Sequence, residues 1–196
     1  MSYLEYTVKT TPTGLRKVLY LNWPLAILLA AVACVGFLML YSVAGGSFSP
    51  WAEPQIKRFA LGFAIMLLVA MVPIWFWRNM AGVAYGLSIL LLLVVEFFGT
   101  SAGGAQRWID LGFIRLQPSE LMKISLVMFL AAYYDWLPVK KTSHPLWVLV
   151  PVVIILLPAG LVFAQPDLGT ALLLMLAGAA MMFFAGAHWA YFAAVF

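Results

Sequence analysis

The sequence predicts an all-α, polytopic membrane helical bundle with six transmembrane helices and the start of a seventh. Composition is the first reason, because 65% of the residues are hydrophobic and 9% are charged, whereas a soluble domain carries about 25% charged residues. The second reason is that the apolar residues form runs close to the ~20 residues that a helix needs to cross a bilayer. The third is that five of the eighteen charged residues (11 Lys and Arg plus 7 Asp and Glu) gather between residues 103 and 123.

The first 23 residues are a polar, basic segment, and we expect them to lie in the cytoplasm. Tyr20 and Trp23 are aromatic residues of the kind that anchor a chain at the membrane interface. The apolar run that follows, 24–41, is 18 residues long. Because this exceeds the apolar region of a normal signal peptide, we interpret it as a retained first transmembrane helix.

Six apolar runs of membrane length follow one another along the chain. They are 24–44, 59–77, 79–98, 118–134, 145–164 and 168–186. After a short turn at His188 and Trp189 a new apolar run begins, and the sequence stops inside it. We therefore expect residues 24–196 to be one incomplete transmembrane domain, the N-terminal part of a longer chain.

Basic residues in short loops indicate the orientation. With the N-terminus inside, six basic residues fall inside and five outside, so the basic N-terminus and the Lys140–Lys141 pair are the features that favour a cytoplasmic N-terminus. The acidic residues beyond residue 50 separate more clearly, because five of them fall outside on this arrangement: Glu53, Glu96, Asp110, Glu120 and Asp167. The outer face would then carry a mixed-charge surface.

The charged stretch leads into the helix predicted from Pro118, a residue that suits the first helical turn because its missing N–H costs nothing there. Glu120 and Lys123 are three residues apart and so lie on one face of that helix. An ionisable residue deep in a bilayer costs about 2.5–3.5 kcal/mol, and such a pair returns only about 0.2–0.5 kcal/mol. We therefore expect the pair to face a polar cavity. The alternative is that Lys123 extends to the surface and Glu120 only interacts with the helix dipole.

Two stretches, GAQRWIDLGFIRLQPSELMK (104–123) and AQPDLGT (164–170), resemble the SEDS family of peptidoglycan polymerases, which act in shape, elongation, division and sporulation. The sequence of the first stretch, at residues 104–108, looks more like the RodA branch, whose members act in elongation, than the FtsW branch, whose members act in division. The resemblance covers roughly residues 20–196. It implies a fold of about ten transmembrane helices in the bacterial cytoplasmic membrane.

The resemblance also implies an activity. Full-length members are glycosyltransferases that extend glycan strands from lipid II on the outer face, which here would serve elongation and rod shape. The partner implied is a class B penicillin-binding protein. The catalytic residue of this chain is unknown, because the family's catalytic aspartate lies in a later outer loop, beyond residue 196. We accordingly expect the 196-residue chain alone to be inactive.

A substrate cavity is the site that the resemblance implies, and cations are needed there because the leaving pyrophosphate of lipid II is negatively charged. The candidate cavity residues are Arg107, Arg115, Gln117, Ser119, Glu120 and Lys123. The two arginines suit bidentate contact with phosphate and Lys123 a point-charge contact. The alternative for both arginines is a solvated loop or contact with lipid headgroups.

Gln165, Pro166 and Asp167 form the second candidate group, either structural or lining the cavity. Pro166 ends one helix and Asp167 can cap the next, and we favour this structural role. Asp167 is not the family's catalytic aspartate. No metal site is expected from the residues, and a divalent cation is left open as a cofactor.

Two other function classes remain open. One is a flippase that transports the lipid-linked cell-wall precursor, whose cavity charges would bind the same pyrophosphate without making a bond. The other is a non-catalytic membrane scaffold for the penicillin-binding protein. An acidic residue placed as a general base in an outer loop would favour the enzyme. The expected partners are otherwise membrane lipids, and the scattered basic residues exclude nucleic acid.

Overall fold

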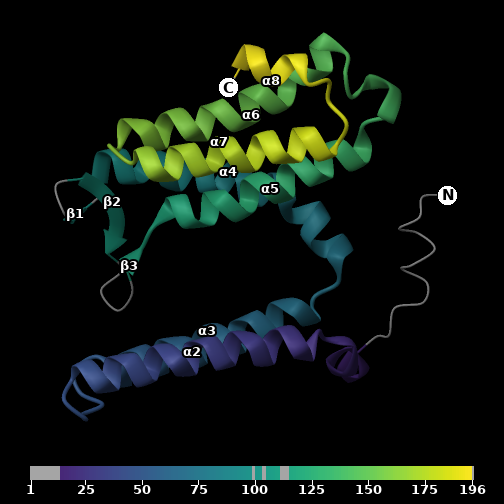
Figure 1. Ribbon diagram of the computed structural model, residues 1–196. Helices are drawn as coiled ribbons and strands as arrows, with labels where there is room; N and C mark the ends of the chain where they lie inside the picture. Colours follow the sequence, from purple (N-terminus) through teal and green to yellow (C-terminus); the bar gives the residue numbers. More distant parts are fainter. Residues whose placement is uncertain (1–13, 99, 103–104, 111–114, 196) are drawn as a thin grey trace. The chain divides into compact units, whose positions relative to one another are not determined.

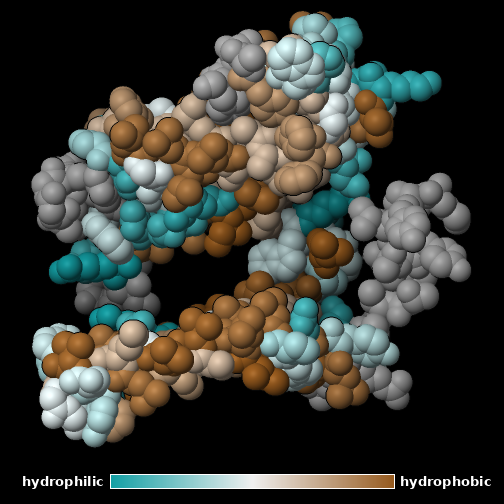
Figure 2. Space-filling view, in the orientation of Figure 1, coloured by the Kyte–Doolittle hydropathy of each residue, from teal (hydrophilic) through white to brown (hydrophobic). Residues whose placement is uncertain are grey.

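The computed structural model describes residues 14–98, 100–102, 105–110 and 115–195 of the 196-residue chain (Figure 1). The chain divides into two compact units, Met1–Pro73 and Ile74–Phe196, and each is described by itself. Figure 2 shows hydrophobic residues along most of the visible sides of the helices in each unit. Such surfaces suit contact with lipid chains.

The first unit is a helical hairpin preceded by the 3₁₀-helix η1 (Gly14–Tyr20). Helix α2 (Trp23–Val43) begins where Asn22 Oδ1 accepts a hydrogen bond from the Leu25 N–H at 3.2 Å, a standard N-cap. Helix α3 (Ala52–Met71) returns antiparallel to α2. Lys17 Nζ donates to the Met71 carbonyl at 2.9 Å, which ties the start of the described chain to the end of α3.

The boundary between the second and third predicted helices was wrong by several residues. We expected 59–77 and 79–98 with a break at Arg78, whereas α3 ends at Met71 and α4 (Ile74–Phe98) already contains Arg78. The break lies at Pro73, because proline lacks an N–H and forces the residue before it out of the helical conformation. Val72 is accordingly extended, with ψ at 134°. Arg78 is accommodated inside α4 by an ion pair with Asp135, 2.7 Å from Nη2 to Oδ2.

The second unit is a bundle of four long helices with a small sheet at one end. After α4 come α5 (Pro118–Trp136), the 3₁₀-helix η2 (Val139–Lys141), α6 (Pro145–Ala164), α7 (Leu168–Phe184) and the short α8 (Ala190–Val195). Helix α4 packs on α5, α5 on α7, and α6 on α7. The predicted start of a seventh helix therefore corresponds to α8.

The predicted helical fold is confirmed, but the charged stretch, which was expected to be a loop, contains a small sheet. Strands β1 (Thr100–Ala102), β2 (Ala105–Asp110) and β3 (Arg115–Leu116) form an antiparallel sheet in the order β1-β2-β3. Asp110 lies opposite Arg115 in the β2–β3 register. Strands of two to six residues with few alternating apolar positions give only a weak periodic signal.

A single apolar core holds the second unit together, contributed by α4, α5, α6 and α7. Its buried members are Leu92, Met122, Leu126, Leu130, Val148, Val152, Ile155, Ala159, Val162, Ala171, Leu174, Met182 and Ala187. Two buried serines bridge α4 and α5: Ser125 Oγ donates to Ser88 Oγ at 3.0 Å, and Ser88 Oγ donates to the Ala84 carbonyl at 2.8 Å. Such bonds satisfy polar groups that lipid cannot.

The protein is a multi-pass membrane protein, but the predicted number of spans is confirmed only in part. Among the described residues, α2, α3, α4 and α6 are long and apolar enough to cross a membrane. Helix α7 is apolar but has only 17 residues. Helix α5 has 19 residues and is not among the candidates, and it carries Glu120, Lys123 and Asp135. The six-helix order is present, while six separate crossings stay a prediction.

Candidate functional site

The candidate residues gather at one end of the second unit, where the sheet meets the start of α5 and the turn between α6 and α7 (Figure 1). The Gln165 side chain bonds to the last turns of α4 and so brings this turn to the same end. The Arg78–Asp135 pair and the η2 lysines lie at the opposite end, where α4 begins and α5 ends. This separation within the unit matches the two sides assigned from the sequence.

Glu120 and Lys123 form an ion pair in the first turns of α5, with 2.8 Å between Nζ and Oε1. Pro118 begins the helix, and the extended backbone of Gln117 precedes it. A carboxylate in the first turn is also favoured by the helix dipole. The pair is not deeply enclosed, since 57% of the Glu120 side chain and 31% of the Lys123 side chain are exposed.

The position of this pair on α5 shows what it borders. Ser119 and Met122 are buried against the core, whereas Leu121 and Ile124 are exposed. Lys123 thus lies at the margin of the packed face, whereas Glu120 lies on the open face of the helix. The predicted polar cavity beside the pair stays a prediction.

The two other candidates at the start of α5, Gln117 and Ser119, differ in their burial and contacts. Gln117 is half-buried in the N-cap position, where its carbonyl accepts from the Glu120 N–H at 3.1 Å. Ser119 is 3% exposed. Ser119 is therefore a packed residue in this part of the chain, while Gln117 connects β3 to α5.

The two candidate arginines belong to the sheet. Arg115 begins β3, and its Nε lies 3.6 Å from Asp110 Oδ2 on the neighbouring strand. This cross-strand pair leaves most of the Arg115 side chain exposed, at 69%. Arg107 lies in β2, but its side chain lies outside the described residues.

The turn between α6 and α7 has the structural geometry expected for it. Asp167 caps α7: Oδ1 accepts from the Thr170 N–H at 3.2 Å and Oδ2 from the Thr170 hydroxyl at 2.9 Å. Gln165 is 5% exposed and its Nε2 donates to the Leu92 carbonyl on α4 at 3.2 Å. Pro166 is exposed between them. The cap predicted for Asp167 is confirmed, and Gln165 connects two helices.

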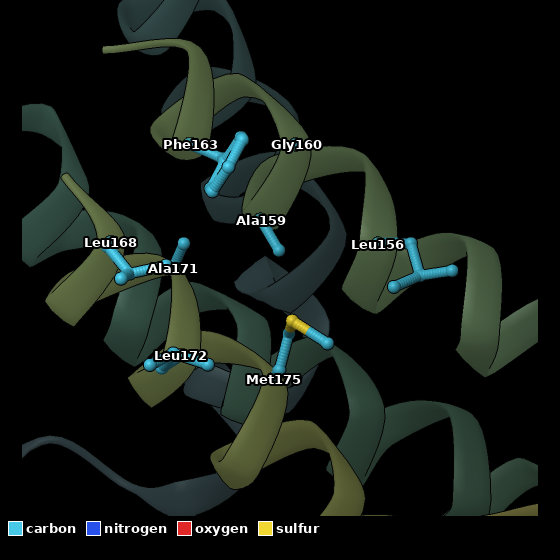
Figure 3. Close-up of a pocket in the computed structure, with 8 residues that line it drawn as sticks. All are labelled: Leu156, Ala159, Gly160, Phe163, Leu168, Ala171, Leu172 and Met175. Atoms are coloured by element: carbon cyan, nitrogen blue, oxygen red, sulfur yellow. The ribbon is translucent and has the colours of Figure 1, made fainter. Parts of the chain in front are cut away.

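A pocket of about 260 Å³ lies between α6 and α7 (Figure 3). Its lining is apolar throughout: Leu156, Ala159, Gly160, Phe163, Leu168, Ala171, Leu172 and Met175. None of the candidate cavity residues lines it. This pocket is therefore not the polar cavity that the sequence predicts.

No cluster of three or more His, Cys, Asp or Glu side chains suited to a metal ion occurs within the described residues. Two polar features escaped the sequence analysis. One is the buried Ser88–Ser125 bridge, which two serines inside apolar runs could have signalled. The other is a pair of tyrosines, Tyr85 and Tyr133, that bond to main-chain carbonyls of α6.

Known proteins similar to this chain belong to one family of bacterial membrane proteins. The family model described as cell cycle protein, for FtsW, RodA and SpoVE, matches residues 22–196. The chain is 34% identical over 174 residues to the peptidoglycan glycosyltransferase MrdB of Escherichia coli K12, an alignment that covers 87% of this chain and 45% of MrdB. The chain thus spans about half the length of the curated relatives it matches.

Two solved structures are similar in fold. The rod shape determining protein RodA of Thermus thermophilus superposes with a TM-score of 0.77 at 31% identity, covering 86% of this chain and 55% of RodA. A chain from a peptidoglycan synthase complex, described as coordinating polymerization and crosslinking, gives the same TM-score at 30% identity and covers 87% of this chain and 49% of its own length.

Proposed function

Since the chain belongs to the FtsW/RodA/SpoVE family of cell cycle proteins and is RodA-like, we propose that it is the N-terminal part of a peptidoglycan glycosyltransferase. The complete protein polymerises lipid II into glycan strands during cell elongation and so maintains rod shape. The observation that carries this proposal is the similarity to MrdB across 87% of the chain, together with the family match over residues 22–196, a range that contains every candidate cavity residue. Residues 24–196 act as one transmembrane domain, with 1–23 in the cytoplasm.

The outer-face residues have roles that fit this chemistry. Transfer of the sugar leaves a pyrophosphate on the lipid, and fixed cations stabilise the charge that develops there. Arg115 and Lys123 are both partly exposed and each is held by one carboxylate, Asp110 and Glu120. Those carboxylates orient the cations and leave donors free for a phosphate, because Arg has five N–H donors and Lys three.

The partner we propose is a class B penicillin-binding protein that crosslinks the new strands. The support is the likeness to a chain of a complex that couples polymerization with crosslinking. The complete protein lies in the bacterial cytoplasmic membrane, with its N-terminus and the Lys140–Lys141 loop in the cytoplasm.

Purified full-length protein, together with its partner, is expected to make glycan strands from lipid II, whereas the 196-residue chain alone is expected to make none. The physical reason is that none of the acidic side chains in the described residues has been identified as the general base that the transfer needs. Gel analysis of strands made from labelled lipid II measures both. Strands from the short chain would contradict the second expectation. Full-length protein that moves labelled lipid II across vesicle membranes without making strands would support the flippase instead.

The orientation can be measured by labelling single cysteines in intact cells, on a Cys34→Ala background because Cys34 is exposed. We expect an impermeant thiol reagent to label Gln106→Cys, on the outer side, and to label Lys141→Cys only after the membrane is opened. The basis is the bias of basic residues toward the cytoplasm. The reverse pattern would invert the whole arrangement.

A further inference from the structure

Helix α6 contains two buried prolines in its interior, Pro151 and Pro158. In a regular helix the N–H of each residue bonds to the carbonyl four residues earlier. Proline has no N–H, so the carbonyls of Trp147 and Ile154 lose their usual partners. The prolines are seven residues apart, close to two helical turns, and the two freed carbonyls therefore lie on the same face of α6.

Each freed carbonyl accepts a hydrogen bond from a tyrosine hydroxyl of a neighbouring helix. Tyr85 of α4 donates to the Ile154 carbonyl at 2.8 Å, and Tyr133 of α5 donates to the Trp147 carbonyl at 2.8 Å. The Tyr85 ring also stacks on Phe129 of α5, with 4.8 Å between ring centres and 25° between planes. Both hydroxyls thus replace the N–H that a proline removed.

The environment makes this replacement important. A main-chain carbonyl inside a bilayer has no water to bond to, and an unsatisfied one is costly, so neighbouring helices commonly supply the missing donor. We propose that the Tyr85–Pro158 and Tyr133–Pro151 pairs form two interhelical hydrogen-bonded links that fix the position of α6 against α4 and α5. In each pair the proline leaves a main-chain carbonyl of α6 without its helical donor, and the tyrosine hydroxyl donates to that carbonyl.

These two links also affect the end of the unit that carries the candidate residues. Helix α6 runs directly into Gln165, whose side chain bonds to the Leu92 carbonyl on α4. Helix α6 is thus hydrogen-bonded to α4 through its middle and through Gln165 at its end, and to α5 near its start. These main-chain hydrogen bonds then act together with the apolar contacts of α6 to fix where the turn at 165–167 lies along the bundle. This inference does not depend on the proposed function.

The test is a double-mutant cycle on the stability of the full-length protein. Tyr85→Phe removes the donor, and Pro158→Ala restores the missing N–H so that the Ile154 carbonyl is satisfied within α6. We expect Tyr85→Phe alone to raise the unfolding equilibrium constant about 3- to 15-fold, the range of hydrogen bonds between membrane helices. In the Pro158→Ala background the same change should have less than a ~1.5-fold effect. Reversible unfolding in a detergent titration measures all four proteins.

The Tyr133→Phe and Pro151→Ala cycle repeats the test on independent residues, so the proposal is testable even if one proline variant does not fold. Tyr134→Phe is the matched control, because the neighbouring Tyr134 hydroxyl is buried with no hydrogen-bond partner among the described residues. Removing it should leave stability unchanged or raise it. Equal effects of Tyr85→Phe and Tyr133→Phe with and without the prolines would overturn the proposal, as would no effect in either background.

Discussion

Replacing Glu120 or Lys123 singly with alanine in the full-length protein is expected to reduce glycan synthesis by at least about tenfold. Removing one member either deletes a charge that we propose to act at the pyrophosphate or leaves that charge without the partner that holds it in place. Loss of a fully enclosed transition-state donor costs about 10²–10³ in rate. We expect less here because Glu120 is 57% exposed and solvent screens its charge.

The double substitution separates coupling from simple loss. If the two residues act as a unit, the double variant should be less harmful to membrane abundance than the sum of the singles. Abundance by quantitative blotting and strand synthesis from labelled lipid II should both be measured. Near wild-type activity in both single variants, with additive effects, would mean that the pair is only a surface lysine beside a helix cap.

The chain offers a matched control for this experiment in Glu53 and Lys57. They form an ion pair on α3 with 2.6 Å between Nζ and Oε1, and both are more than half exposed. Exposed ion pairs contribute little to stability because water screens both charges. Alanine at either position is therefore expected to leave strand synthesis and abundance close to wild type.

Gly178→Ala is expected to destabilise the protein by about 1–3 kcal/mol, the usual cost of forcing extra volume into a packed core. Gly178 is buried in α7 and faces Ile155 of α6. A methyl group at this position would collide with Ile155 Cγ1 and would lie 2.6 Å from its Cδ1 and 2.9 Å from its Cγ2. Ile155 is fully buried, so its side chain has little room to move away.

A second substitution and a control make the Gly178 test specific. Ile155→Ala removes all three colliding atoms, so the double variant should be less destabilised than the sum of the single effects. At Gly160 of α6 no atom of the described residues, apart from the adjoining residues and backbone of α6 itself, lies within 4 Å of an added methyl group. Gly160→Ala is expected to stabilise slightly, since alanine favours helices over glycine by about 0.5–1 kcal/mol. Tolerance of Gly178→Ala equal to that of Gly160→Ala would contradict the close packing of α6 on α7.

The end of the second helix is one feature that the sequence pattern places wrongly. The pattern puts the end at the aromatic cluster 75–77 and the charge of Arg78. The structure has the boundary at Pro73, because a missing N–H affects the main chain directly, whereas a charged side chain can find a partner. That partner is Asp135, 57 positions away in the sequence (135 minus 78). No pattern around Arg78 identifies it.

Features that depend on neighbouring residues and on the solvent could be predicted from the sequence. A chain that is 65% hydrophobic, with runs of membrane length, can only be a helical membrane protein. The cap at Asp167 and the pairing of Glu120 with Lys123 were predictable as well, because each involves groups three residues apart.

The helix faces that contact one another could not be predicted from the sequence and are seen only in the folded chain. The bonds of Tyr85 to the Ile154 carbonyl and of Gln165 to the Leu92 carbonyl join positions 69 and 73 residues apart. Hydropathy cannot predict such partners, because in a membrane the packed face and the lipid-facing face of a helix are both apolar. What distinguishes the two faces is close fit and main-chain hydrogen bonding, and both come into existence only when the helices are assembled.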